Sequence, residues 1–132
     1  MIGALVVTHG QLAQELVAAA EMIVGEFSHI QAVSIGWHDD VNEARKEIET
    51  RLSEVNRGSG VVILTDMFGG TPSNIAFSFH EPGSVDVITG VNLPMILKIA
   101  SQTEGETLET LAAAVRDQGR ASISMASDFL DK

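Results

Sequence analysis

Residues 2–10 read Ile-Gly-Ala-Leu-Val-Val-Thr-His-Gly, a continuous apolar run that ends in two polar residues and a glycine. A second run of the same kind, Val61–Leu64, leads into Thr65-Asp66. Runs that are apolar at every position are typical of central strands in a parallel sheet, because helices cover both faces of such a sheet. We therefore predict that both runs are buried strands.

The rest of the chain alternates between shorter apolar runs and segments with helical spacing. The further strands expected are Ile30–Ile35 and Val85–Ile88. Two helices are expected from apolar stripes, the first at Leu12, Leu16, Ala19 and Ile23 and the second at Val41, Ala44, Ile48, Leu52 and Val55. A third helix is expected to begin at Thr71-Pro72, and two more are expected over Leu93–Ala100 and Thr107–Gln118. This alternation predicts one α/β domain over residues 1–132, a doubly wound, mostly parallel sheet in the order 2-1-3-4 with right-handed crossovers.

The last segment breaks this rhythm because two expected helices precede it. Gly119 is expected to stop the second of them. In Ala121–Ala126, Ser122 and Ser124 alternate with Ile123 and Met125, as in a half-exposed edge strand. We expect this strand to lie antiparallel at a sheet edge or to pair with another subunit.

Composition excludes several classes of function. The 132 residues include 18 acidic and 8 basic residues and no cysteine, so disulfides and thiolate chemistry are excluded. A net charge of −10 makes nucleic acid a poor partner and favours encounter with a basic protein. The N-terminal apolar run lacks a basic region and is too short to span a membrane, so we expect a cytoplasmic protein without membrane insertion.

One histidine and one aspartate are expected to meet at the candidate site. In an open parallel sheet, ligands bind beyond the carboxyl ends of the strands, where the strand order reverses. For the order 2-1-3-4 this point lies between the first and third strands, which are followed by His9 and by Asp66. A carboxylate that bonds one imidazole nitrogen leaves the lone pair of the other free to attack phosphorus.

The segment Gly69-Gly70-Thr71-Pro72-Ser73 follows this aspartate. The glycines allow close backbone approach, and the N–H groups at the start of the next helix can face an anion. The hydroxyls of Thr71 and Ser73 are further candidate donors to a phosphoryl group. The scheme needs no metal and no cofactor.

Each of these features has a simpler interpretation on its own. A histidine after a strand is more often a structural loop residue, and Gly-Gly-Thr-Pro is commonly just a turn that opens a helix. Their convergence on one crevice favours function. We expect His29, His38 and His80 to be ordinary surface or loop residues, and Trp37 to be partly buried. The phosphate-loop, nucleophile-elbow and dinucleotide motifs are missing from the sequence.

Three motifs together resemble one known family. They are Ile2–Gly10, Leu64–Asn74 (Leu-Thr-Asp-Met-Phe-Gly-Gly-Thr-Pro-Ser-Asn) and Gly90–Met95 (Gly-Val-Asn-Leu-Pro-Met). In this order, and across essentially the whole chain, they resemble the enzyme IIA component of the mannose family in the bacterial phosphoenolpyruvate-dependent sugar phosphotransferase system.

The resemblance implies a histidine phosphocarrier. His9 matches the histidine that the carrier HPr phosphorylates on Nε2, Asp66 matches the aspartate that orients it, and Thr71 matches a hydroxyl position of the family. The phosphoryl group would pass to an enzyme IIB-type acceptor, and the family's dimers exchange a C-terminal strand, as Ala121–Ala126 could.

Departures from the family pattern leave alternatives open. Met67-Phe68 stands where sugar-transporting members often have Thr-Trp, which leans toward regulation by the phosphorylation state rather than transport. A non-covalent module that binds small anions is a different class of function. The phosphotransferase subunit of a dihydroxyacetone kinase has a similar topology but lacks the Gly-Gly-Thr-Pro run.

Overall fold

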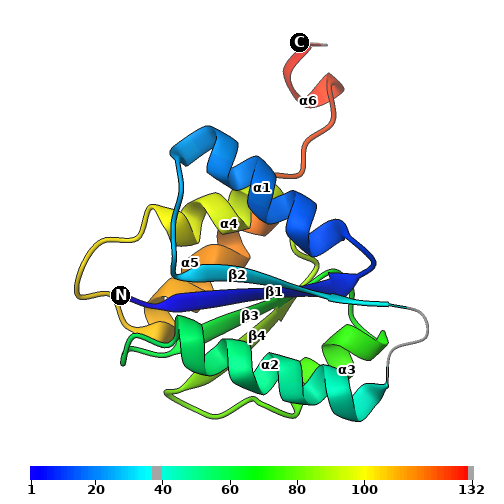
Figure 1. Cartoon of the computed structure of the whole chain (residues 1–132). Coiled ribbons are helices and arrows are strands. Elements are labelled where there is room, and N and C mark those ends of the chain that lie inside the picture. Colours follow the sequence, from blue (N-terminus) through cyan, green and yellow to red (C-terminus); the bar gives the residue numbers. More distant parts are fainter. Residues whose placement is uncertain (37–39, 131–132) are drawn as a thin grey trace.

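The computed structural model describes residues 1–36 and 40–130 and contains a four-stranded sheet (Figure 1). The strands are β1 (Gly3–His9), β2 (Ile30–Ile35), β3 (Val61–Thr65) and β4 (Val85–Thr89). Their order is β2-β1-β3-β4, and every neighbouring pair is parallel. This confirms the predicted order and brings the carboxyl ends of β1 and β3 side by side.

Helices cover both faces of the sheet (Figure 1). One layer consists of α1 (Leu12–Val24), α4 (Leu93–Ala100) and α5 (Leu108–Ala121), and the other of α2 (Val41–Val55) and α3 (Thr71–Phe77). Because successive side chains of a strand point to opposite faces, Ala4 and Val6 of β1 enter the core beneath the first layer, and Leu5 and Val7 enter the core beneath the second. All four are fully buried, which explains the continuous apolar run.

The buried face of α1 differs from the predicted stripe. Ala13 and Ala20 are fully buried against the sheet, whereas Leu12 and Ile23 are 46% and 60% exposed. Small side chains allow the helix to approach the sheet closely. Leu16 and Val17 are partly buried against the same core, and the other large apolar residues of the helix are exposed.

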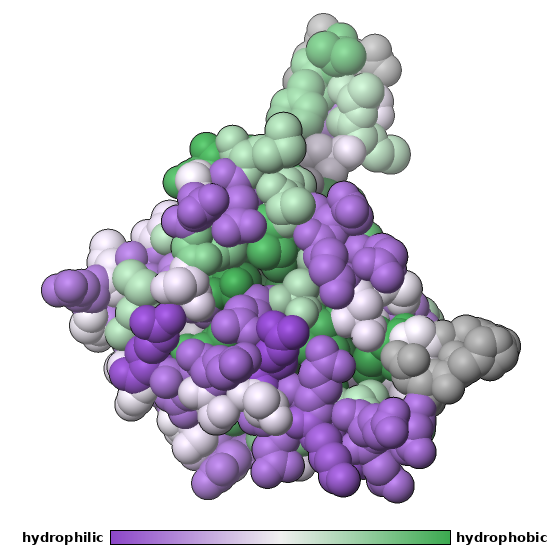
Figure 2. All heavy atoms as spheres, in the orientation of Figure 1, coloured by the Kyte–Doolittle hydropathy of each residue, from purple (hydrophilic) through white to green (hydrophobic). Residues whose placement is uncertain are grey.

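The predicted C-terminal strand is absent from the described single chain. α5 continues through Gly119 to Ala121, and a short helix, α6 (Ser127–Leu130), follows after a segment without regular structure. Gly119 does not stop the helix. A Cβ at Gly119 would lie 2.6 Å from Met95 Sδ, so this glycine permits the close packing of α5 on α4. The segment beyond α5 stands away from the domain (Figures 1 and 2).

His29 is a loop residue, in line with the expectation, but it is buried and only 8% exposed. Burial and then the charges of Arg57 and the N-terminal amine lower the pKa of the imidazole. His80 is half exposed, as expected, while Trp37 and His38 lie outside the described residues. Of the described helices, none is long and apolar enough to span a bilayer.

Candidate phosphoryl-transfer site

β1 and β3 present the histidine and the aspartate at the sheet edge where the strand order reverses. His9 is the last residue of β1, and Asp66 directly follows β3. His9 Nδ1 lies 2.8 Å from Asp66 Oδ2. The same carboxylate oxygen accepts the main-chain N–H of His9 at 3.1 Å. Both the ring and the backbone of His9 are therefore hydrogen-bonded to Asp66 Oδ2.

The other carboxylate oxygen is also held. The main-chain N–H of Met67 donates to Asp66 Oδ1 at 3.0 Å. The Asp66 side chain is only 14% exposed, whereas the His9 side chain is 50% exposed. A fixed acceptor at Nδ1 favours the tautomer with the proton on Nδ1, which leaves the lone pair on Nε2.

The turn after His9 is fixed by a buried hydroxyl. Thr8 is fully buried, and its Oγ1 donates to the carbonyl of His9 at 3.1 Å. The same oxygen accepts the N–H of Ala13 at 2.7 Å. Because this N–H belongs to the first turn of α1, Thr8 connects the start of that helix to the backbone of the histidine.

Gly70 packs closely against the imidazole of His9. A Cβ at this position would lie 2.8 Å from His9 Cε1 and 3.2 Å from His9 Nε2, so only glycine fits against the ring in this arrangement. Gly70 is the N-cap of α3 and has extended backbone angles, with φ −92° and ψ 171°. The close approach, rather than an unusual backbone angle, explains the glycine.

The other residues of this segment take different positions. Thr71 is exposed at the first position of α3. Ser73 is fully buried, and its Oγ accepts the N–H of Gly69 and donates to the carbonyl of Gly70, each at 3.0 Å. The sequence places Ser73 in the site, but its hydroxyl is turned into the loop.

Exposed apolar side chains lie next to this site, and the sequence pattern did not predict them as a surface. Met67 and Phe68 are 54% and 74% exposed. The rings of Phe68 and Phe77 form an edge-to-face pair with centroids 5.8 Å apart. The sequence feature that indicates this surface is the apolar pair Met67-Phe68 directly after Asp66.

The fold and the site define a class of protein, namely a small doubly wound α/β domain that presents one imidazole, held by a carboxylate, at its topological switch point. Comparison with known proteins agrees with this class. The family described as "PTS system fructose IIA component", EIIA-Man, matches residues 3–116. The chain belongs to this family of phosphotransferase-system proteins, which act as phosphocarriers in sugar phosphotransfer.

Individual relatives support this assignment. The chain is 30% identical to the fructose-specific EIIA component of Bacillus subtilis, over all of the chain and 91% of that protein. It is 26% identical to the mannose-specific EIIAB component of Escherichia coli, over 88% of the chain and only 36% of the relative, so it spans about a third of that protein. The mannose/sorbose-specific IIA subunit of Enterococcus faecalis superposes with a TM-score of 0.82 at 28% identity, covering 93% of the chain and 92% of that subunit.

Proposed function

We propose that the protein is a cytoplasmic histidine phosphocarrier in which His9 Nε2 accepts a phosphoryl group. The observation that carries this proposal is the 2.8 Å contact between His9 Nδ1 and Asp66 Oδ2 on a ring that is half exposed. The contact fixes the orientation of the ring and leaves Nε2 as its basic nitrogen. A nucleophilic histidine requires such an orienting partner, which leaves the lone pair of the second ring nitrogen free.

The transfer step needs only in-line displacement at phosphorus. The lone pair of Nε2 forms the new N–P bond as the bond from phosphorus to the donor atom breaks, and the donor keeps that electron pair. The imidazole becomes positively charged, and the Asp66 carboxylate stabilises this charge through the Nδ1–H bond. Transfer to the acceptor is the same step in reverse.

The groups proposed to contact the phosphoryl oxygens are the backbone N–H groups of Gly70 and Thr71 and the Thr71 hydroxyl. Thr71 is exposed, and Gly70 already lies against the Nε2 side of the ring. Gly69 and Ser73 belong to the same loop, but their N–H and hydroxyl groups bond each other. Their role is to shape the loop. No metal and no cofactor takes part in this scheme.

The proposed donor is the phosphorylated carrier HPr, and the proposed acceptor is an enzyme IIB-type protein or a regulatory target. Membership of the phosphotransferase-system family supports both kinds of partner. The net charge of −10 favours rapid encounter with a basic donor surface.

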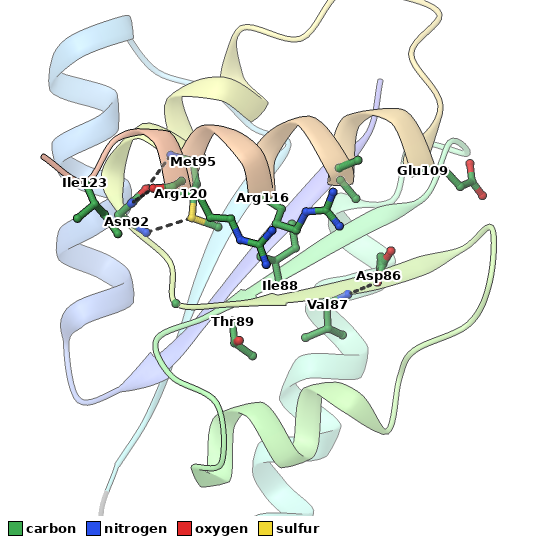
Figure 3. Close-up of a pocket in the computed structure, with 14 residues that line it drawn as sticks. Asp86, Val87, Ile88, Thr89, Asn92, Met95, Glu109, Arg116, Arg120 and Ile123 are labelled. Atoms are coloured by element: carbon green, nitrogen blue, oxygen red, sulfur yellow. Dashed lines mark hydrogen bonds between the residues drawn. The ribbon is translucent and has the colours of Figure 1, made fainter.

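We further propose that two copies of the chain pair by exchanging their C-terminal segments. β4 forms one edge of the sheet, and a groove of about 510 Å³ runs between β4 and α5 (Figure 3). Ile88 and Arg116 line this groove. Beyond α5, four apolar side chains are 67–78% exposed: Ile123, Met125, Phe129 and Leu130. Figure 2 shows largely hydrophobic colours on the part of this segment that projects from the domain.

This segment of one chain can pair along β4 of the other, by the strand-addition mode of recognition, and so cover its own exposed apolar side chains. Sedimentation of the intact protein checks the proposal. We expect a dimer that Met125→Asp dissociates, while Met22→Asp, on the exposed surface of α1, leaves it unchanged. If the intact protein sediments as a monomer, the exchange of C-terminal segments is refuted.

The phosphocarrier proposal is tested by intact mass after incubation with phosphoenolpyruvate, enzyme I and HPr. We expect one acid-labile phosphoryl group on the wild type and none on His9→Ala. If neither protein is modified by components that phosphorylate a known IIA protein, the proposal fails. Reversible phosphate binding in the crevice would then favour the anion-binding module. Rapid transfer onward to an enzyme IIB protein would indicate transport, and its absence would favour regulation.

A further inference from the structure

The buried hydroxyl of Ser73 forms hydrogen bonds within the loop of the candidate site. Its Oγ accepts the N–H of Gly69 and donates to the carbonyl of Gly70, each at 3.0 Å. The residue is 0% exposed. Serine is a hydrophilic residue that is seldom fully buried unless its hydrogen bonds are satisfied, and here they are satisfied entirely by the loop.

The local sequence leaves few other ways to fix this loop. Gly70, the N-cap of α3, has no side chain to accept an N–H group of the first turn, and Pro72 has no N–H at all. Ser73, in the first turn, therefore bonds backward to the residues before the helix.

The position of the loop determines the surroundings of the reactive ring. Gly70 lies so close to His9 that an added Cβ would be 2.8 Å from Cε1 and 3.2 Å from Nε2. Asp66 holds the ring through Nδ1, which lies 2.8 Å from the carboxylate. The imidazole is thus bounded by a hydrogen bond on one nitrogen and by the Gly70 backbone beside the other.

We propose that Ser73 is a positioning residue that acts on phosphoryl transfer through Gly70. Its hydroxyl holds the Gly69–Gly70 peptide so that Gly70 limits rotation of the imidazole and the Nε2 lone pair keeps one direction. This inference rests on the proposed phosphocarrier function and adds a residue that touches neither the phosphoryl group nor the imidazole. Misplacement of reacting atoms by about 1 Å can cost two orders of magnitude in rate.

The variant Ser73→Ala removes both hydrogen bonds and does not lower the helix propensity. We expect kcat for phosphorylation by phospho-HPr to fall roughly 10- to 100-fold with little change in KM, because the donor still docks but fewer complexes are aligned. Ser73→Thr retains the hydroxyl and should restore much of the rate. Ser73→Cys, with a weak donor and acceptor of similar shape, should lie between the two.

Ser78→Ala is the matched control, since Ser78 ends the same helix and its hydroxyl donates to the carbonyl of Ile75 at 2.6 Å. Its rate should equal that of the wild type. Nitrogen-15 NMR of the His9 imidazole separates positioning from stability, because a purely structural role would lower the melting temperature and leave the ring signals unchanged. We expect shifted or broadened Nδ1 and Nε2 signals in Ser73→Ala.

An unchanged rate per folded molecule together with unchanged ring signals in Ser73→Ala and Ser73→Cys would overturn the inference. A wild type that HPr fails to phosphorylate would overturn the proposed function instead. In that case the NMR comparison still decides whether Ser73 positions the His9 ring.

Discussion

Replacing Gly70 by alanine tests the geometry around His9 most directly. The new Cβ would lie 2.8 Å from His9 Cε1, whereas carbon atoms in contact are normally about 3.5–4.0 Å apart. The ring must therefore move by roughly 0.7–1.2 Å. A movement of this size either stretches the 2.8 Å contact between Nδ1 and Asp66 Oδ2 or turns Nε2 away from the donor.

The expected loss follows from that contact. A hydrogen bond to a charged group contributes about 1.5–3 kcal/mol, which corresponds to a fall of about 10- to 150-fold in the rate of phosphorylation. The assay is the initial rate of phosphoryl transfer from phospho-HPr, followed by intact mass, with the folded fraction of each sample measured by circular dichroism.

A double-mutant cycle supplies the control. The backbone angles of Gly70 are ones that alanine adopts readily, so Gly70→Ala in a His9→Ala background should be neutral or slightly stabilising. In the wild-type background the ring contact should appear as a coupling of about 0.5–3 kcal/mol in the free energy of unfolding. A wild-type transfer rate in Gly70→Ala, with no coupling to position 9, would refute the geometry described for this loop.

Three further changes have defined outcomes. Asp66→Asn should slow transfer by about 10- to 150-fold, because the amide can turn an N–H group toward Nδ1 of His9; transfer kinetics and far-ultraviolet circular dichroism together check that the fold survives. Gly119→Ala should lower the free energy of unfolding by about 1–3 kcal/mol in urea titrations, because its Cβ meets Met95 Sδ at 2.6 Å, and shortening Met95 should recover part of the loss. Because the pKa of His29 is lowered in the folded protein, the unfolded chain binds more protons at this residue. The free energy of unfolding should therefore decrease as the pH falls below 6.5, the ordinary pKa of a histidine. Urea titrations between pH 5 and 8 should show a smaller decrease for His29→Leu, and equal pH dependence in the two proteins would contradict the assignment.

The sheet could be predicted from sequence because burial on both faces leaves a simple pattern. In β1 every residue from Gly3 to Thr8 is buried, so the run is apolar throughout until Thr8. The strand order and the meeting of His9 with Asp66 followed from the general behaviour of parallel sheets. Both were visible without any knowledge of side-chain contacts.

The faces of helices were harder to predict, because spacing alone does not say how close two elements approach. The stripe that begins at Leu12 has the same spacing as the buried alanines of α1, and the size of the side chains decided which side faces the sheet. Gly119 is a usual signal for a helix end, but here it admits Met95. Such a contact joins residues that are far apart in the sequence, so the local pattern does not contain it.

The alternation in Ala121–Ala126 indicated a strand, and the described chain shows none there. A strand needs hydrogen bonds from a neighbouring strand, and sequence pattern reports only the tendency to form them. The position of Ser73 is a similar case. Its hydroxyl, in the segment that opens a helix, suggested a donor to an anion, but the direction of that hydroxyl depends on the loop before α3.

Because one oxygen of Asp66 bonds both the ring and the backbone of His9, the rate at which His9 is phosphorylated depends on whether the chain is folded. His9 and Asp66 are 57 positions apart in the chain, and they meet only when β1 and β3 pair. A chain in which these two strands have separated keeps its imidazole but loses the group that orients it. The initial rate of phosphorylation should therefore fall as this central strand pair opens, and its dependence on urea would measure how often the pair opens.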